Sequence, residues 1–291
     1  GSTGAVLWGG IKISSGGSAV LSNISISGAE SALQVNGDAT IHESISIMNS
    51  YIGFDIGTSG TVDAENVTMS TIDIQSVVNH GTLTIDTALI TNTATGILST
   101  NTLTVDDVSF VETGVAIDVV SGTADITGLG LENVSVGLGS DSGASTTVSS
   151  IYGQHVALLI DGTDADDLTV SNALVSGDRL LWGSIESIAL SDMNFTQENP
   201  GRSAIDLRCS VDCTFDHLYV HNADIGIDVD GAGTTTFSQS EIHADQLGLR
   251  ASGTGLLVLE SSVLTANGTA LSISSVDTEL SDTTMSLHDG I

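Results

Sequence analysis

An apolar position recurs about every 22 residues along the whole chain. The phrase "TLTI" at 82–85 returns as "TLTV" at 102–105, and the last residue of each copy occupies this recurring position. We call the thirteen residues at this position anchors; they are Leu21, Ile41, Val62, Ile85, Val105, Ile126, Val148, Val170, Leu190, Phe215, Phe237, Leu259 and Leu280. Such regular steps, sustained over the whole sequence, predict a solenoid in which each repeat forms one coil.

Each repeat contains three short segments in which apolar and polar residues alternate. A second apolar column follows five residues after most anchors, as at Ile90 and Phe110, and Ser46 and Gly153 interrupt it. A third strand-like piece closes the repeat, as in "VAID" at 115–118. Gly, Asn, Asp and Ser separate the segments, and no stretch has the 3.6-residue apolar spacing of an amphipathic helix. The sequence therefore predicts an all-β protein, a single parallel β-helix of about 12–13 coils of 20–25 residues with three short strands per coil.

The pattern Φ-[S/D]-[D/N]-x-x-Φ, where Φ is apolar, appears in "VDDVSF", "LSDMNF" and "FDHLYV". With the coil length, it resembles the pectate-lyase-like right-handed parallel β-helix superfamily over essentially the whole chain. The resemblance implies a right-handed coil and one domain over residues 1–291 without an internal linker. It implies little about activity, because that superfamily includes lyases, hydrolases, tailspikes, adhesins and non-catalytic surface repeats.

The charge balance excludes several partners. The chain has 36 acidic residues and only five basic ones (Lys12, Arg179, Arg202, Arg208 and Arg250), so its formal net charge is −31. A nucleic-acid-binding protein needs basic patches, and a strongly negative field disfavours anionic membranes and polyuronic substrates. No segment approaches the roughly 18 apolar residues of a membrane helix. We expect no nucleic-acid partner and no membrane insertion; the acidity fits either saline surroundings or simple solubility outside the cell.

Two features favour export. Cys209 and Cys213 in "RCSVDC" are close enough in sequence for a disulfide across a tight turn, with free thiols as the alternative. Five N-x-[ST] glycosylation sequons begin at Asn23, Asn66, Asn133, Asn194 and Asn267. We therefore expect an extracellular or cell-surface protein with glycosylation candidates on its surface.

The only cofactor that the sequence suggests is calcium. Asp63, Asp86 and Asp106 each follow an anchor, so the repeat predicts that they share one column. Carboxylates about 4.8 Å apart repel by about 0.9 kcal/mol even in water, and a calcium ion would relieve this. Solvated acidic patches are the alternative interpretation.

A catalytic site, if the chain has one, is predicted near residues 192–245. The longest step between anchors lies here, and Asp192 and His217 share a position two residues after their anchors. His221 and His243 share another position, six residues after theirs. Paired imidazoles beside a carboxylate suit proton transfer or metal binding. This site would belong to a carbohydrate-active enzyme, a polysaccharide hydrolase or lyase; stacked polar residues facing solvent are the structural alternative.

The leading functional hypothesis is nevertheless a non-catalytic one. Regular coils, no sign of a cleft and an aromatic content of only 3% favour a structural or adhesin-like stalk of a large secreted or cell-surface protein. Such a stalk would bind glycans or neighbouring proteins. We expect the chain to be a segment of a longer one, with neighbouring domains or subunits at its open coil ends, because solenoids usually cap their ends.

Overall fold

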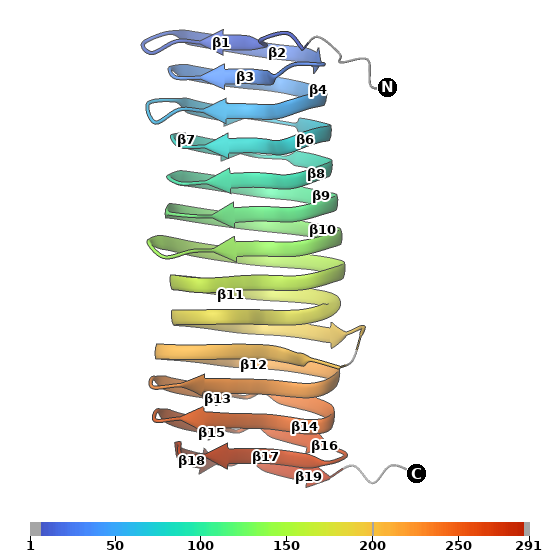
Figure 1. The fold of residues 1–291 in the computed structure, drawn as a ribbon, viewed down its shortest axis with the longest axis vertical. Helices are drawn as coiled ribbons and strands as arrows, with labels where there is room; N and C mark the ends of the chain where they lie inside the picture. Colours follow the sequence, from blue (N-terminus) through green and yellow to red (C-terminus); the bar gives the residue numbers. More distant parts are fainter. Residues whose placement is uncertain (1–6, 200, 288–291) are drawn as a thin grey trace.

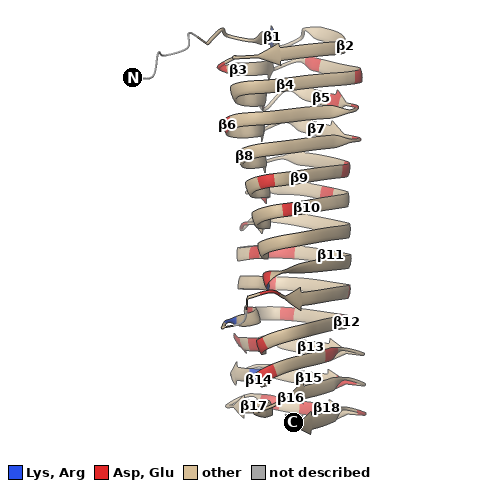
Figure 2. Cartoon of the chain, turned by 90° about the vertical axis from the view of Figure 1, so that its right-hand side faces the viewer, with Lys and Arg blue, Asp and Glu red and all other residues tan. Residues whose placement is uncertain are grey.

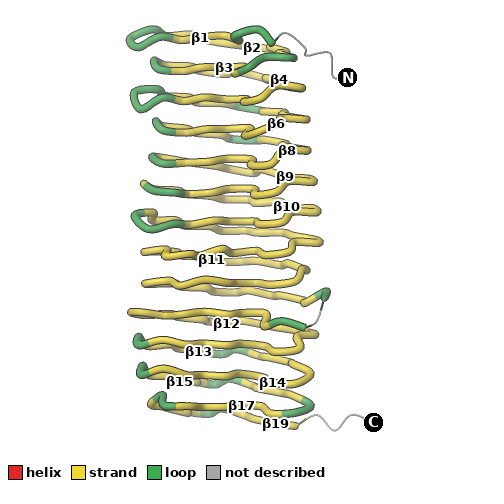
Figure 3. The backbone as a smooth tube through the Cα atoms, viewed as in Figure 1, coloured by secondary structure: helices red, strands yellow, loops and turns green. Residues whose placement is uncertain are grey.

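The computed structural model of the protein describes residues 7–199 and 201–287. Strands make up all the regular secondary structure of this part of the chain, and most connecting loops gather at one edge (Figure 3). The strands are β1 (Ile11–Ile13), β2 (Ser18–Ser27), β3 (Ser31–Val35), β4 (Asp38–Ile56), β5 (Thr61–Ala64), β6 (Val67–Asn79), β7 (Thr82–Ile85), β8 (Ala88–Ser99), β9 (Thr102–Val119), β10 (Gly122–Ser140), β11 (Ala144–Gln197), β12 (Ser203–Gly231), β13 (Thr234–Ser238), β14 (Glu241–Gly253), β15 (Leu256–Glu260), β16 (Val263–Ala266), β17 (Thr269–Ser274), β18 (Asp277–Ser281) and β19 (Thr284–Leu287).

The strands stack as successive coils of a parallel β-helix of about 12 turns (Figure 1). Ile126 of β10 pairs in register with Val105 of β9 on one side and with Val148 of β11 on the other. Several strands continue through the corners of the coil, which is why β11 alone contains 54 residues. The prediction of a single all-β parallel β-helix is confirmed.

Single residues in the left-handed conformation form the corners of the coil. Asp107 and Asn172 have φ values of 54° and 55° at one corner, and Glu112 has a φ of 53° at another. Asn and Asp tolerate this conformation better than most residues, because their short polar side chains bond locally. The third residue of the Φ-[S/D]-[D/N] pattern is thus the corner residue, and the pattern indicates a turn of the coil.

The anchor residues form a continuous apolar column inside the solenoid. Ile41, Ile85 and Val105 are at most 1% exposed. Because one coil alone cannot cover its inward side chains, this burial depends on the neighbouring coils. In the last coil Leu280 is 51% exposed, and its coverage by a neighbouring domain or subunit stays a prediction.

The register differs from the predicted one at a single anchor. Ala64, not Val62, pairs with both Ile41 and Ile85, while Val62 pairs with Leu83. Val62 and Ala64 both point inward, since side chains two residues apart in a strand lie on the same face. The larger Val62 matched the apolar pattern better, so the predicted alignment was shifted by two residues.

Acidic side chains are distributed over most of the coils, whereas basic ones are few (Figure 2). In the part of the chain that the structure describes, no helix is long and apolar enough to cross a membrane.

Candidate functional site

The four residues of the predicted catalytic site form two separate pairs. Asp192 and His217 are left-handed corner residues on consecutive coils, and they align because the residues on either side of them pair in register. The Nδ1 atom of His217 lies 3.0 Å from Asp216 Oδ2. The pKa of Asp216 is lowered, first by a hydrogen bond from Ser238 and also by His217, which together outweigh burial.

The rings of His221 and His243 stack on each other across two successive coils, in the strand segment that follows the corner at His217. Their ring centroids are 5.6 Å apart, and His243 Nε2 lies 2.6 Å from Glu241 Oε1. His221 comes four positions after the corner residue His217, which corresponds to roughly 13 Å of extended chain. The predicted pairs therefore exist, but they do not converge on one reaction centre. Among the described residues no group of three or more His, Cys, Asp or Glu side chains is arranged to hold a metal ion.

The predicted calcium column is wrong at Asp63. Because of the two-residue shift at Val62, Asp63 pairs with Thr84 and not with Asp86. The residue before Asp86 in this column is Glu65, since the Asp86 amide bonds to Ala64 O in the preceding coil. Calcium binding at Asp86 and Asp106 stays a prediction. Among the described residues these two carboxylates belong to no group of three or more that could hold a metal ion.

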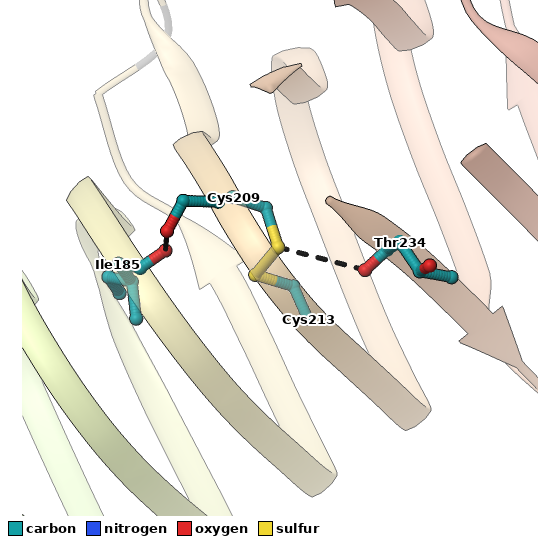
Figure 4. The surroundings of a disulfide bond; sticks show 5 residues. Ile185, Cys209, Cys213 and Thr234 are labelled. Carbon is teal, nitrogen blue, oxygen red and sulfur yellow. Dashed lines mark hydrogen bonds between the residues drawn. A yellow bond between two sulfur atoms is a disulfide. The ribbon is translucent and has the colours of Figure 1, made fainter. Parts of the chain in front are cut away.

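Cys209 and Cys213 are joined in a disulfide in the structure, with their Cα atoms 6.1 Å apart. The bond closes a small bulge of β12, at which the register with β11 shifts between Ile185 and Ser187. The bulge lies between Ile185 of the preceding coil and Thr234 of the following one (Figure 4). The asparagines of the five predicted sequons are all exposed, and Asn23, Asn66 and Asn133 are left-handed corner residues; their glycosylation stays a prediction.

The structure contains a groove whose wall lies in the longest step between anchors, within the predicted region 192–245, but none of the four predicted catalytic residues lines it. It has a volume of about 760 Å³ and is lined by Ala157, Leu158, Asp161, Asp178, Arg179, Trp182, Asn199, Gly201 and Arg202. Its floor is the outer face of β11, and its wall is the segment that follows β11, which leaves the stack on the side opposite most loops (Figure 3). We call Asn199, Gly201 and Arg202 the groove wall.

The groove combines an aromatic surface with both signs of charge. Trp182 is 42% exposed, although large aromatic side chains are rare in this chain. Two of the five basic residues, Arg179 and Arg202, line the groove together with Asp161 and Asp178. Asp178 Oδ1 accepts a hydrogen bond of 2.5 Å from Asn199 in the wall. The Nε atom of Arg179 is buried and has no hydrogen-bond partner among the described residues, although the side chain itself lines the groove.

A smaller hollow of about 190 Å³ adjoins the groove and shares Asp161 with it. Asp118, Gly139 and Asp161 follow one another in register on three successive coils, and Thr163 donates a hydrogen bond of 2.8 Å to Asp161. Burial raises the pKa of Asp118, and the nearby charges of Asp141 and Asp161 raise it further. The two aligned carboxylates are about 9.5 Å apart at their Cα atoms, which is two rungs of the sheet.

A sequence signal for these carboxylates exists in the third strand of the coil. An Ile-Asp pair recurs there, at 117–118, 160–161, 205–206 and 227–228, with the isoleucine inward and the aspartate outward. The recurrence marks one outward row of aspartates along the solenoid. It does not reveal the groove, since the wall lies outside the repeat.

No protein-family model and no curated protein matches the sequence. Among solved structures, the chain is similar to the catalytic unit of a thermostable GH87 alpha-1,3-glucanase from Streptomyces thermodiastaticus strain HF3-3, with a TM-score of 0.46 and 14% sequence identity. The match covers 95% of this chain and 64% of the other, so this chain spans less than two thirds of its neighbour's length.

The hypothesis of a non-catalytic stalk is therefore corrected. It depended on a smooth solenoid without a cleft, whereas the described residues form a groove with carboxylates and an exposed tryptophan.

Proposed function

We propose that the protein is a carbohydrate-active enzyme that hydrolyses a polysaccharide in the groove and the adjoining hollow. The observation that carries the proposal is the exposed Trp182 in a groove that also contains two carboxylates and two guanidinium groups. The indole offers an amphipathic surface for the apolar face of a sugar ring, and the charged groups bind its hydroxyls.

Asp118 and Asp161 take the catalytic roles in this proposal. Asp118 protonates the glycosidic oxygen of the leaving sugar, and its raised pKa suits a general acid. Asp161 removes a proton from the water that attacks the anomeric carbon. An inverting glycosidase needs about 6.5–9.5 Å between its two carboxyl groups to admit this water. Asp118 and Asp161 lie on either side of Gly139, which has no side chain, and the attacking water is proposed to lie between their carboxyl groups.

The substrate is proposed to be neutral. With a net charge of −31, the protein repels polyuronic chains at long range, and the two groove arginines are balanced by Asp161 and Asp178. A glucan, xylan or mannan avoids this repulsion.

We further propose membership of the pectate-lyase-like superfamily, with its right-handed coil, and secretion of the protein. The disulfide and the exposed sequons support secretion, because both features occur outside the reducing cytosol. Mass spectrometry of the protein from its native source, without reductant, tests it by measuring the disulfide and any attached glycan.

The experiment for the main proposal measures reducing ends released from a panel of neutral polysaccharides that includes alpha-1,3-glucan. Asp118→Asn and Asp161→Asn are each expected to lower kcat by about 10²- to 10⁴-fold. Asp63→Asn, on a different row of the solenoid, is the matched control and keeps full activity. Absence of turnover on every polysaccharide, or full activity of Asp118→Asn, would contradict the proposal. If His217→Ala and His243→Ala lose activity while both aspartate variants keep it, the catalytic site lies at the histidine pairs and not in the groove.

A further inference from the structure

Glu198 connects the groove wall to two earlier coils. Its Oε1 accepts a hydrogen bond of 2.5 Å from Ser176, one coil before, and its Oε2 lies 2.9 Å from Nδ1 of His155, two coils before. The Glu198 amide also donates to Gly177 O at 2.7 Å. A β-carbon on Gly177 would lie 1.9 Å from Val156 O, so the intervening coil offers no side chain there.

Gln197 fixes the same segment from the inside. It is only 3% exposed, and its Nε2 donates to Asp178 O at 2.7 Å and to Arg202 O at 3.3 Å. Its Oε1 accepts a hydrogen bond of 3.2 Å from the Asp224 amide. Gln197 does not titrate, whereas Glu198 carries a carboxyl group that does, with a lowered pKa.

We infer that the His155–Glu198 ion pair is a pH-dependent latch that positions the groove wall opposite Trp182. The consequence for substrate binding rests on the proposed function, but the latch itself does not. His155 and Glu198 are positioning residues in this inference, because neither lines the groove.

The sign of the dependence follows from the charge of Glu198. Burial alone would raise the pKa of Glu198, but the hydrogen bonds from Ser176 and His155 and the charge of His155 outweigh it and lower the pKa. Glu198 therefore stays ionised somewhat below the ordinary range of a glutamate. The latch holds while Glu198 is ionised and fails as the pH falls through its lowered pKa.

Other charged groups near the latch do not compete for these atoms. Glu132 lies one rung before Gln154, His221 lies one rung after Thr196, and Asp178 bonds to Asn199. His155 is 64% exposed and Glu198 26% exposed, so solvent screens the pair. We expect the latch to shift the wall without a large effect on global stability.

The test uses Trp182 as the reporter. Trp8 is the second tryptophan of the chain, and Trp8→Phe leaves Trp182 alone. Acrylamide quenching and emission maximum are measured across the acidic range up to neutral pH in this background, in His155→Gln and in Glu198→Gln. His42→Gln is the matched control, since His42 pairs with Glu65 at 3.8 Å on a distant coil. Far-UV circular dichroism verifies that each variant is folded.

The expected result is a red shift and stronger quenching of Trp182 as the pH falls through the lowered pKa of Glu198. This transition is lost in Glu198→Gln, moves to higher pH in His155→Gln and is unchanged in His42→Gln. A pH-independent Trp182 signal, or a transition that survives Glu198→Gln, overturns the inference. Because no carbohydrate is added, the latch succeeds or fails independently of the proposed hydrolysis.

Discussion

The ring of Phe215 stacks on the ring of Phe237 in the next coil, with their centroids 4.6 Å apart and their planes 11° from parallel. The two residues are in register and fully buried, so they are consecutive members of the anchor column. Stacked aromatic pairs contribute about 0.5–1.5 kcal/mol beyond the burial of their surface. This contact represents the general interaction that holds the solenoid together, in which equivalent side chains of adjacent coils cover one another.

Phe237→Ala is expected to lower the free energy of unfolding by about 3–5 kcal/mol, because it leaves a cavity between Phe215 and Leu259. Phe237→Leu, which keeps most of the volume, is expected to lower it by less. Urea unfolding followed by circular dichroism measures both. Equal stability of the alanine variant and the wild type would show that these side chains do not share a column.

Asn79→Ala is expected to destabilise the protein by about 1–3 kcal/mol, because buried groups lose their partners. The fully buried amide of Asn79 donates to Thr102 O at 2.8 Å and to Ser99 Oγ at 3.0 Å, and it accepts from the Gly81 amide at 3.1 Å. Asn101→Ala is the control, since exposed Asn101 donates a single bond to His80 O. If the two variants have the same unfolding midpoint, the turn does not depend on Asn79.

The period of the apolar residues was sufficient to predict the fold and twelve of the thirteen anchors. The exception at Val62 has a physical cause. A register slip of two residues keeps every side chain on its own face, so alternation alone cannot detect it. The small Ala64 gave too weak an apolar signal to correct it, and the calcium column that included Asp63 was wrong as a result.

The repeat pattern indicated the groove only through its longest step, which contains the groove wall. Its floor belongs to ordinary coils, and the Ile-Asp pairs at 117–118 and 160–161 were visible in the sequence. Its wall depends on Gln197 and on contacts between residues 43 positions apart, such as His155 and Glu198. Such contacts require the three-dimensional stacking, which periodicity gives only for the repeated part of each coil.

Replacement of both cysteines by alanine is expected to lower the free energy of unfolding by roughly 2 kcal/mol, the chain-entropy value for a loop this short. The disulfide closes only the bulge between Cys209 and Cys213, so the coils on either side keep their register. Urea unfolding with and without reductant measures the effect. A reductant that leaves the wild-type midpoint unchanged would mean that the thiols are free in solution.

Asp118→Asn is expected to raise stability near neutral pH while it lowers activity. The pKa of Asp118 is raised in the folded state, first by burial and then by Asp141 and Asp161, so ionisation disfavours the native protein. The wild type therefore loses stability as the pH rises from the ordinary aspartate value near 3.8 through the raised folded value. The stability difference between the variant and the wild type should be absent at low pH and reach a plateau above that window. Thermal unfolding from pH 3 to 8 measures it, and a variant less stable than the wild type at pH 7 would contradict the account.

The central claim, that a polysaccharide is bound and cleaved between Asp118 and Arg202, is tested most directly by a crystal structure of Asp161→Asn with a bound oligosaccharide. We expect a sugar ring on the indole of Trp182, sugar hydroxyls at the guanidinium groups that line the groove and a glycosidic oxygen beside the carboxyl group of Asp118. A sugar chain bound instead along the His217–His243 face, with the groove empty, would contradict it.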